Sequence, residues 1–175
     1  MPDAAAAAAI GVPADEVARR TGELWQAERA HAQLCEDAAG GDAIQRLVTT
    51  NTVDWLRLDC ELIQSADEDV AKEAALLVRE DGMDLPEVAR VAGLALQSSR
   101  SWAGDITAEL RGRLVSAAPG ELVGPIATGG DFVLAHVRAK LVPDASDPDV
   151  RARAEAAARA QALERVVREE VRRRG

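Results

Sequence analysis

Apolar side chains recur along this chain with spacings that change several times, and each change predicts a new element. Residues 13–38 repeat them at helical spacing behind an acidic start, which indicates a long amphipathic helix. The glycine pair at 40–41 ends that helix, and Asp42 can cap a second, shorter one. The chain therefore opens with a helical segment.

From Val53 onward the apolar positions alternate with polar ones, which predicts a β-strand. One side of this strand is apolar and the other is mostly charged. The apolar side carries Leu56, Leu58, Cys60 and Leu62, and the other carries Arg57, Asp59, Glu61 and Ile63.

Two helices are predicted after this strand. Ser65 and Glu68 have the spacing of a capping box, and the helix that follows is stopped at Gly82. Asp84 then precedes a short helix that reaches Ala92, with a proline near its first turn, where the missing N–H is harmless.

Residues 93–104 are predicted to form a loop around Trp102, and a four-stranded sheet is reached if a further short strand lies near residues 94–98. Asp105 can cap the next helix, in which apolar residues recur every four positions. Two strands follow, and the Thr-Gly-Gly-Asp sequence at 128–131 predicts a tight hairpin between them.

The last predicted helix begins at Asp147-Pro148 and runs nearly to the end of the chain. Its apolar stripe needs a partner, and the helix at 13–38 is the natural one. The stripe comprises Val150, Ala154, Ala157, Leu163, Val167 and Val171.

The order of elements predicts an α+β fold with a small, mostly antiparallel sheet. We expect residues 1–52 to form an N-terminal helical segment and residues 53–143 to form the α+β domain. Residues 144–175 then supply a C-terminal helix that packs on the N-terminal helices.

Composition narrows the classes of function. A net charge of −9 over 175 residues argues against a nucleic-acid partner, which would require a basic surface. No stretch is long and apolar enough to cross a membrane, and the alanine run at 4–9 lacks the basic flank of a secretory signal. Two cysteines do not make a disulfide framework. We therefore expect a cytoplasmic protein.

The segment 110–143 resembles the closing half of a parvulin-type peptidyl-prolyl isomerase domain. It carries a helix, a Pro-Gly turn, the strand sequence Glu-Leu-Val-Gly-Pro-Ile from residue 121, a glycine hairpin and a strand that opens on the only Phe. The strand predicted from Val53, together with residues 73–92, resembles the first half of that domain, with Asp84-Leu85 where the family has Asp-Phe. The resemblance covers residues 56–141, and it implies a parvulin-like fold and a peptide as ligand.

The resemblance also implies which residues form the site. The family uses two histidines, a Cys or Asp, and apolar residues that hold the proline ring. Here Glu61 takes the place of the first histidine, and Phe132-Val133 stands where the family has an aromatic residue and the second histidine. Ile106 and Leu110 take the apolar places. The peptide-binding residues implied in this way are Ile106, Leu110, Phe132 and Val133, to which we add Trp102 as an aromatic contact.

Few groups in this domain can act as acid or base. Asp59, Glu61 and His136 are the obvious candidates, and strand alternation places His136 with Leu134, Arg138 and Lys140, opposite Val133. Prolyl isomerisation has a barrier of roughly 20 kcal/mol and needs placed polar groups. With Val133 in place of an imidazole, we expect weak or no isomerase activity.

We expect neither a cofactor nor a metal ion. His31 and Cys35 have a spacing that could hold zinc, but no second pair completes a usual site. Cys60 lies on the apolar side of its strand, which indicates a buried and inert thiol.

The phrases at 121–126, 140–143 and 147–154 also resemble parvulin-related proteins that accompany ribosomally made peptide natural products. This implies a non-catalytic accessory protein or chaperone that binds a precursor peptide or an unfolded segment, with peptide-modifying enzymes as further partners. One alternative is an enzyme that closes lanthionine or thioether rings with Asp59, Glu61 and His136. Active prolyl isomerisation is a weaker one.

Overall fold

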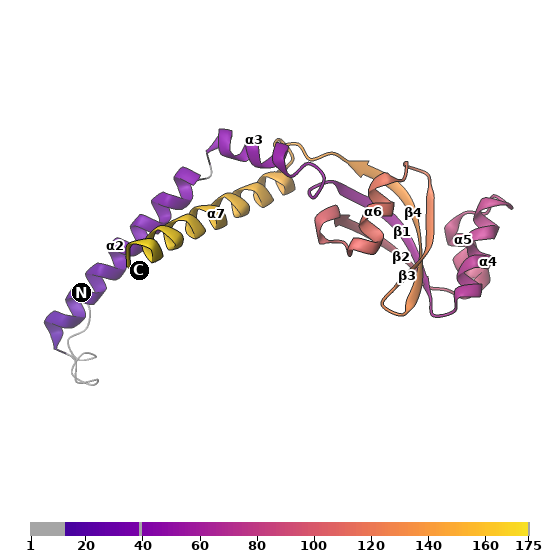
Figure 1. Ribbon diagram of the computed structural model, residues 1–175, viewed down its shortest axis with the longest axis horizontal. Coiled ribbons are helices and arrows are strands. Elements are labelled where there is room, and N and C mark those ends of the chain that lie inside the picture. Colours follow the sequence, from indigo (N-terminus) through magenta and orange to yellow (C-terminus); the bar gives the residue numbers. More distant parts are fainter. Residues whose placement is uncertain (1–12, 39, 175) are drawn as a thin grey trace. The chain divides into compact units, whose positions relative to one another are not determined.

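The computed structural model describes residues 13–38 and 40–174 (Figure 1). The chain divides into two compact units, Val48–Val150 and a second made of Met1–Leu47 with Arg151–Gly175. The predicted three-part division at residues 52 and 143 stays a prediction.

The flanking helices are α2 (Ala14–Ala38), α3 (Gly41–Thr50) and α7 (Pro148–Arg174). On α7 the buried line consists of small residues spaced four apart, namely Val150, Ala154, Ala158 and Ala162. The predicted stripe is therefore wrong in its second half, because Leu163, Val167 and Val171 are exposed. A spacing of four keeps these small side chains near one line of the helix, since each full turn takes 3.6 residues.

Four antiparallel strands form the sheet of the Val48–Val150 unit, in the order β2-β1-β4-β3. They are β1 (Arg57–Ser65), β2 (Leu96–Trp102), β3 (Leu122–Thr128) and β4 (Asp131–Leu141). Three helices accompany them, α4 (Glu68–Arg79), α5 (Leu85–Ala92) and α6 (Ala108–Ser116). The predicted α+β class with a mostly antiparallel sheet, flanked by N- and C-terminal helices, is confirmed.

The predicted loop at 93–104 is wrong, and the further short strand left open near residues 94–98 is present, shifted to Leu96–Trp102. Most of that segment is strand β2, an edge strand that pairs along β1 from Leu96 to Trp102. Its serine-rich sequence, LQSSRSW, lacks the alternation that marks a strand with one buried face. Because the neighbouring strand supplies the pairing, this segment becomes a strand without a hydrophobic pattern of its own.

Asp84 caps α5 as predicted, because its side chain accepts a hydrogen bond from the N–H of Glu87. At α4 the N-cap is Asp67 and not Ser65, because the Asp67 carboxylate accepts hydrogen bonds from the backbone N–H groups of Asp69 and Val70. The Ser65 hydroxyl instead donates to the Asp67 carbonyl and accepts from the Asp67 N–H. Asp105 does not cap α6; it ends a short 3-10 turn, Ala103–Asp105, before the helix begins.

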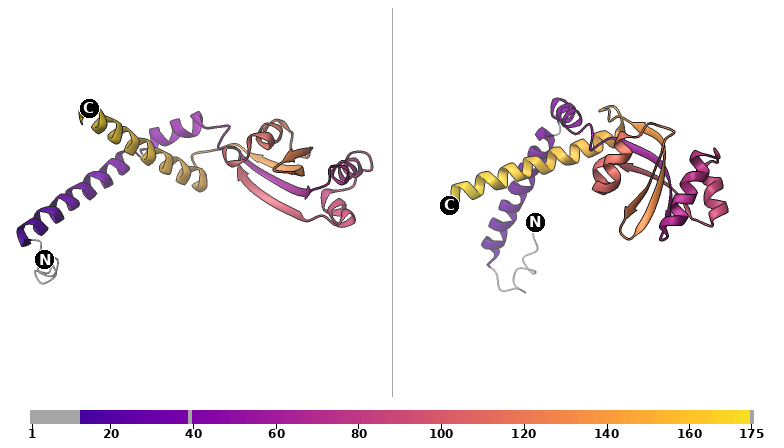
Figure 2. Two further views of the ribbon diagram at one scale, coloured as in Figure 1. Left: turned by 60° about the horizontal axis from the view of Figure 1, so that its bottom comes forward. Right: turned by 45° about the vertical axis from the view of Figure 1, so that its right-hand side comes forward.

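Helices lie on both sides of the sheet, α6 on one and α4 with α5 on the other (Figures 1 and 2). The side covered by α6, named the α6 face, holds a core formed by Leu58, Cys60, Ala103, Leu114, Ala117, Val123, Ala135 and Val137. The opposite side, named the α4–α5 face, holds Ile63, Ala74, Ala75, Leu85, Val88, Ala89 and Leu134. Strand β1 therefore contributes to two cores, one on each face.

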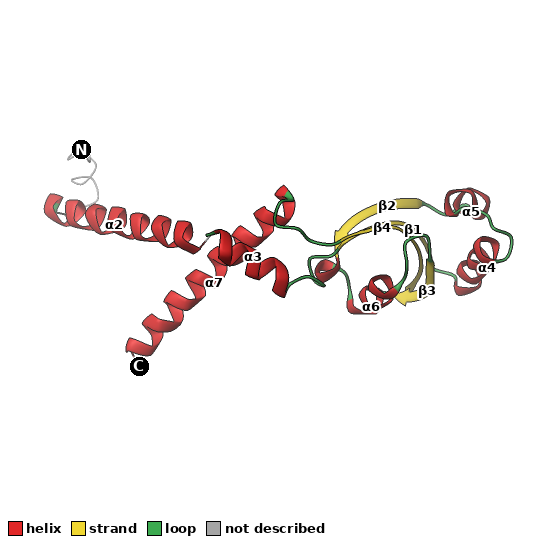
Figure 3. Cartoon of the chain, turned by 90° about the horizontal axis from the view of Figure 1, so that it is seen from above, coloured by secondary structure: helices red, strands yellow, loops and turns green. Residues whose placement is uncertain are grey.

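Two bulges, one in β4 and one in β3, shift the alternation of side chains between the two faces of the sheet. Figure 3 draws the strands in yellow. In β4 the pairing with β1 gains a residue at Arg138, so that Leu58 pairs with Lys140 and Cys60 with Val137. The bulge turns Lys140 to the α6 face, where its ammonium donates to the carbonyl of Val115 at 2.6 Å. The predicted grouping of Lys140 with His136 is therefore wrong.

The second bulge lies in β3, between Val123 and Ile126. Strict alternation would place these two residues on opposite faces. The extra residue lets both contribute to the α6 face, Val123 in the core and Ile126 packed against it. The predicted hairpin at 128–131 is present, and Gly129 and Gly130 both have the positive φ that a two-residue turn of this kind requires.

The free edge of β3 is blocked by a side chain from α4. The guanidinium of Arg79 donates to the carbonyl of Gly124 at 2.6 Å and to that of Leu122 at 3.5 Å. These acceptors face away from β4 and would otherwise be open to another strand. Arg79 therefore protects this edge from pairing with a second chain.

Candidate functional site

Four half-buried apolar side chains pack against the core on the α6 face. Leu62 comes from β1, Ile106 and Leu110 from the start of α6 and the residues before it, and Ile126 from β3. All four pack against the buried core of that face and remain partly accessible to solvent. We name this surface the apolar floor.

Val133 lies beside the floor residue Ile126. It pairs with Ile126 on β3, and alternation along β4 places it on the same face as Ala135 and Val137. Only 8% of it is exposed, so it supports the floor more than it offers a contact. The site thus has a hydrocarbon side chain at the position where the resemblance implies a histidine.

The structure separates the other two predicted peptide contacts from the floor. Phe132 precedes Val133 in β4 and pairs with Ser65 and Ala127, which places it on the opposite face. Trp102 ends β2 opposite Arg57, whose guanidinium lies 5.1 Å from the centre of its ring. Arg57 also forms ion pairs with Asp147 and Asp149. Trp102 is therefore part of a structural cluster on the α4–α5 face.

The acid–base candidates form hydrogen bonds and ion pairs on the α4–α5 face. The Glu61 carboxylate lies 3.6 Å from Nδ1 of His136 and 3.5 Å from the guanidinium of Arg138. The other ring nitrogen of His136 lies 3.2 Å from the carbonyl oxygen of Gly120. Asp59 accepts a hydrogen bond from Arg100 at 2.9 Å. These groups are held by one another across neighbouring strands.

The sheet lies between the two sets of candidate residues. Leu58, Cys60 and Leu62 point to the α6 face, so Asp59 and Glu61 point away from it, as Ile63 does into the opposite core. A peptide on the apolar floor therefore cannot reach the Glu61–His136 pair, because a β-sheet separates them. The predicted catalytic and peptide-binding residues do not form one site.

The thiol of Cys60 is free and buried in the core of the α6 face. Burial, assisted by the nearby Asp59 charge, raises the pKa of its thiol, although Lys140 acts in the opposite direction. A thiol with a raised pKa carries little thiolate at neutral pH and is a poor nucleophile.

We predict that Cys60 reacts with a thiol reagent only when the sheet opens. In a Cys35→Ser variant, where Cys60 is the single remaining thiol, labelling by dithionitrobenzoate should follow the unfolding rate and not the reagent concentration. Rapid labelling of the folded protein, first order in reagent, would contradict the assignment of Cys60 to the core.

A cleft of about 300 Å³ opens beside the floor, between α6 and the edge of β3. Its walls come from the second half of α6, the turn after it, the start of β3 and one side chain of α4. The residues that line it are Arg79, Gly112, Arg113, Ser116, Ala117, Glu121, Leu122, Val123 and Gly124. Sequence reasoning did not find this cleft, because Arg79 precedes the start of α6 by 29 positions along the chain.

Leu62 and Ile126 are the floor residues that sequence reasoning missed as contacts. The alternation of β1 already placed Leu62 with Cys60, so its face could have been predicted. No such signal existed for Ile126, because its side is set by the bulge in β3.

Among the residues that the structure describes, no group of three or more His, Cys, Asp or Glu side chains is arranged to hold a metal ion. Of the described helices, none has the length and hydropathy needed to cross a bilayer.

Comparison with known proteins adds little to this picture. No family model and no curated protein matches the chain. A solved structure that matches comes from Campylobacter jejuni and is described as that of SurA-like chaperones, the virulence factor PEB4 and the periplasmic protein Cj1289. The identity is 10%, the TM-score is 0.34, and the match covers 97% of this chain and 68% of that chain. The fold described above therefore rests on the strands and helices of this chain alone.

Proposed function

We propose that this protein binds extended peptide segments on the apolar floor of the α6 face, as a non-catalytic accessory protein or chaperone. The single observation that carries the proposal is the floor itself. Leu62, Ile106, Leu110 and Ile126 are half-buried apolar side chains gathered from three parts of the sheet unit. Covering such a surface with apolar side chains of a ligand removes it from water, which makes the free energy of binding more favourable.

The placement of the polar groups favours binding over catalysis. Isomerisation or ring closure needs an acid or base within hydrogen-bond reach of the reacting atoms. The acid–base candidates lie on the other side of the sheet, where each contacts another group. Glu61 pairs with Arg138, His136 lies within hydrogen-bond distance of the Gly120 carbonyl, and Asp59 accepts from Arg100. The thioether cyclase and the active isomerase are accordingly less well supported than a binding protein.

The finer part of the proposal is the identity of the ligand. The resemblance to parvulin-related proteins of peptide maturation systems favours the precursor of a ribosomally synthesised peptide, with its modifying enzymes as further partners. A cytoplasmic setting is part of the same proposal. The apolar floor itself requires only an unfolded segment with apolar side chains.

The proposal predicts that a charge on the floor abolishes peptide binding. The probe is fluorescein-labelled, reduced and carboxymethylated α-lactalbumin, a permanently unfolded chain, followed by fluorescence anisotropy. Leu110→Asp should weaken binding by roughly tenfold or more, because the carboxylate must be desolvated under the ligand. Ile126→Asp, on a different element of the same floor, should have the same effect.

Matched controls separate the floor from other exposed apolar surface. Leu76 on α4 is 55% exposed and lies outside the floor, so Leu76→Asp should bind the probe as the wild type does. Glu61→Gln should also bind normally, since Glu61 faces away. Circular dichroism melting confirms that each variant is folded. Equal binding by Leu110→Asp, Ile126→Asp and wild type would overturn the proposal.

A further inference from the structure

The cleft beside the apolar floor has a local charge opposite to that of the protein as a whole. Two arginines and one glutamate line it, whereas the whole chain carries a net charge of −9. The glutamate, Glu121, already accepts a hydrogen bond from the N–H of Ala118 at 2.8 Å. The cleft is therefore a cationic spot on an acidic protein, which attracts anionic groups.

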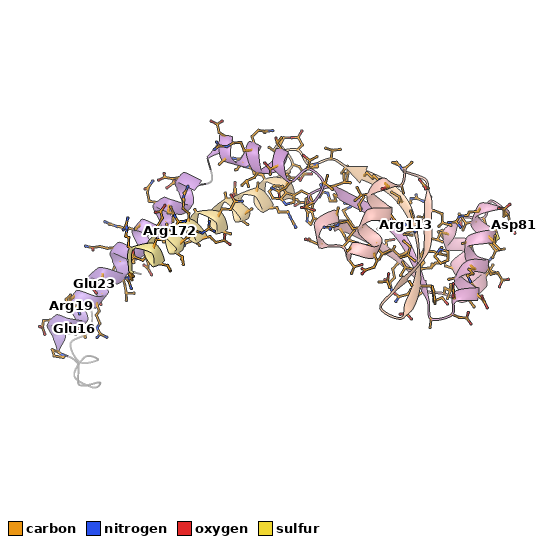
Figure 4. The ribbon with its side chains drawn as sticks, in the orientation of Figure 1. Glu16, Arg19, Glu23, Asp81, Arg113 and Arg172 are labelled. Atoms are coloured by element: carbon orange, nitrogen blue, oxygen red, sulfur yellow. The ribbon has the colours of Figure 1, made fainter. Side chains whose placement is uncertain are left out.

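The two arginines differ in how they are held. Arg79 is fixed by its hydrogen bonds to the carbonyls of Gly124 and Leu122, so its guanidinium has a defined position at the wall. Arg113 projects from α6 (Figure 4), and within the described part of the chain its guanidinium has no ion pair and no hydrogen bond. An exposed guanidinium with five donors and no acceptor is available to an incoming anion.

The cleft continues the floor along both of its walls. On α6, Leu110 and Arg113 are three positions apart, which places them on the same side of the helix, about one turn from each other. On β3, Ile126 and Gly124 are two positions apart, and α6 and β3 pack against each other. A segment that crosses the floor therefore passes from Leu110 and Ile126 directly to Arg113 and Gly124.

Strand addition is not the mode of binding at this cleft. The outward carbonyls of Leu122 and Gly124 are occupied by Arg79, and residue 125 is a proline without an N–H to donate. Recognition at the cleft must then come from side chains, of which the guanidinium groups are the strongest donors. Arginine pairs with carboxylates through two parallel hydrogen bonds.

We propose that the Arg79–Arg113 cleft binds a carboxylate of the peptide whose apolar segment lies on the floor, so that this protein selects peptides with an acidic group next to an apolar run. The inference rests on the proposed function. The carboxylate belongs either to an acidic side chain or to the peptide C-terminus, which share the same chemistry.

The test uses synthetic, fluorescein-labelled peptides that share one apolar segment. The first carries a run of Glu beside it, the second has Gln in place of each Glu, and both are C-terminally amidated; a third is the Gln peptide with a free C-terminus. We expect the wild type to bind the Glu peptide or the free-acid peptide roughly fivefold tighter than the amidated Gln peptide at low salt. Which of the two is preferred identifies the source of the carboxylate.

Arg113→Gln should remove this preference and leave binding of the amidated Gln peptide unchanged. Arg90→Gln, an exposed arginine on α5 outside the cleft, is the charge-matched control and should keep the preference. The preference should also shrink as the salt concentration rises. Arg79→Gln provides a second variant on another element.

The outcomes separate the two claims. If the wild type binds none of the peptides, the proposed function fails. If it binds all three equally well, or if Arg113→Gln and Arg79→Gln both keep the preference, the floor stands as a binding surface and the carboxylate site is overturned.

Discussion

Gly124→Ala should destabilise the sheet unit by about 3 kcal/mol. Gly124 has a φ of +111°, which residues other than glycine rarely adopt. A Cβ at this position would also lie 2.4 Å from the carbonyl oxygen of Val133. That oxygen belongs to the adjacent strand β4, so the backbone itself would have to move. The expected consequence is loss of the bulge that turns Ile126 to the apolar floor.

Gly120→Ala is the matched control for this prediction. Gly120 also has a positive φ, of +88°, but no atom lies within 4 Å of a Cβ built there. Its cost should be the backbone strain alone, about 1 kcal/mol. Urea unfolding in a Trp25→Phe background, where Trp55 and Trp102 report on the sheet unit, measures both variants. Equal losses would contradict the steric argument.

Arg57→Ala is expected to cost about 2 kcal/mol, the second largest effect. Only 15% of the Arg57 side chain is exposed, and it contacts the Trp102 ring and the carboxylates of Asp147 and Asp149. Asp147 also accepts the N–H groups of Asp149 and Val150 at the start of α7. The variant removes the cation that holds these groups together.

The effect of Arg57→Ala should depend on pH. Burial works to raise the pKa of Asp147, but the hydrogen bonds from Asp149 and Val150, with the Arg57 charge, hold that pKa below its usual value. A carboxyl group whose pKa is lowered by folding stabilises the folded protein at pH values above its unfolded-state pKa. This stabilisation is lost as the pH falls through the pKa of the group in the folded protein. The difference in free energy of unfolding between the wild type and Arg57→Ala, measured with urea, should therefore become smaller at acidic pH.

Arg100→Ala provides the control for Arg57. Arg100 forms an ion pair with Asp59 across the same two strands, but its side chain is 63% exposed. Exposed pairs of this kind contribute well under 1 kcal/mol. A loss at Arg100 equal to that at Arg57 would show that burial of the Arg57 cluster does not matter.

Much of the fold follows from local patterns that the sequence displays openly. The helices at 14–38 and 85–92 and the Gly-Gly hairpin were all predictable, because their periods and caps are local. The first strand was predicted too, although it begins at Arg57 and not at Val53. Strand β2 was not, since its residues carry no alternation and depend on pairing with β1. The stripe on α7 was misplaced because the bulky valines near its end are exposed, while small alanines are buried.

The candidate site was predictable only in part, and the bulges explain why. Ile106 and Leu110 pack on the α6 face, and strand pairing places Val133 on the same face, while their role as peptide contacts stays a prediction. Phe132 and Trp102 were assigned to the same surface without regard to the face on which each strand presents them. The registers that place Ile126 and Lys140 on the α6 face depend on one extra residue in β3 and one in β4, which no local pattern announces.

The most direct test of the central claim is to map the bound peptide by methyl NMR. Selectively labelled Leu, Ile and Val methyl groups are recorded with and without unlabelled, carboxymethylated α-lactalbumin. If the peptide lies on the apolar floor, the signals of Leu62, Ile106, Leu110 and Ile126 shift or broaden, while those of Leu76 and Leu85 on the α4–α5 side stay in place. Perturbation centred on Leu76 and Leu85, with the four floor residues unchanged, would contradict it.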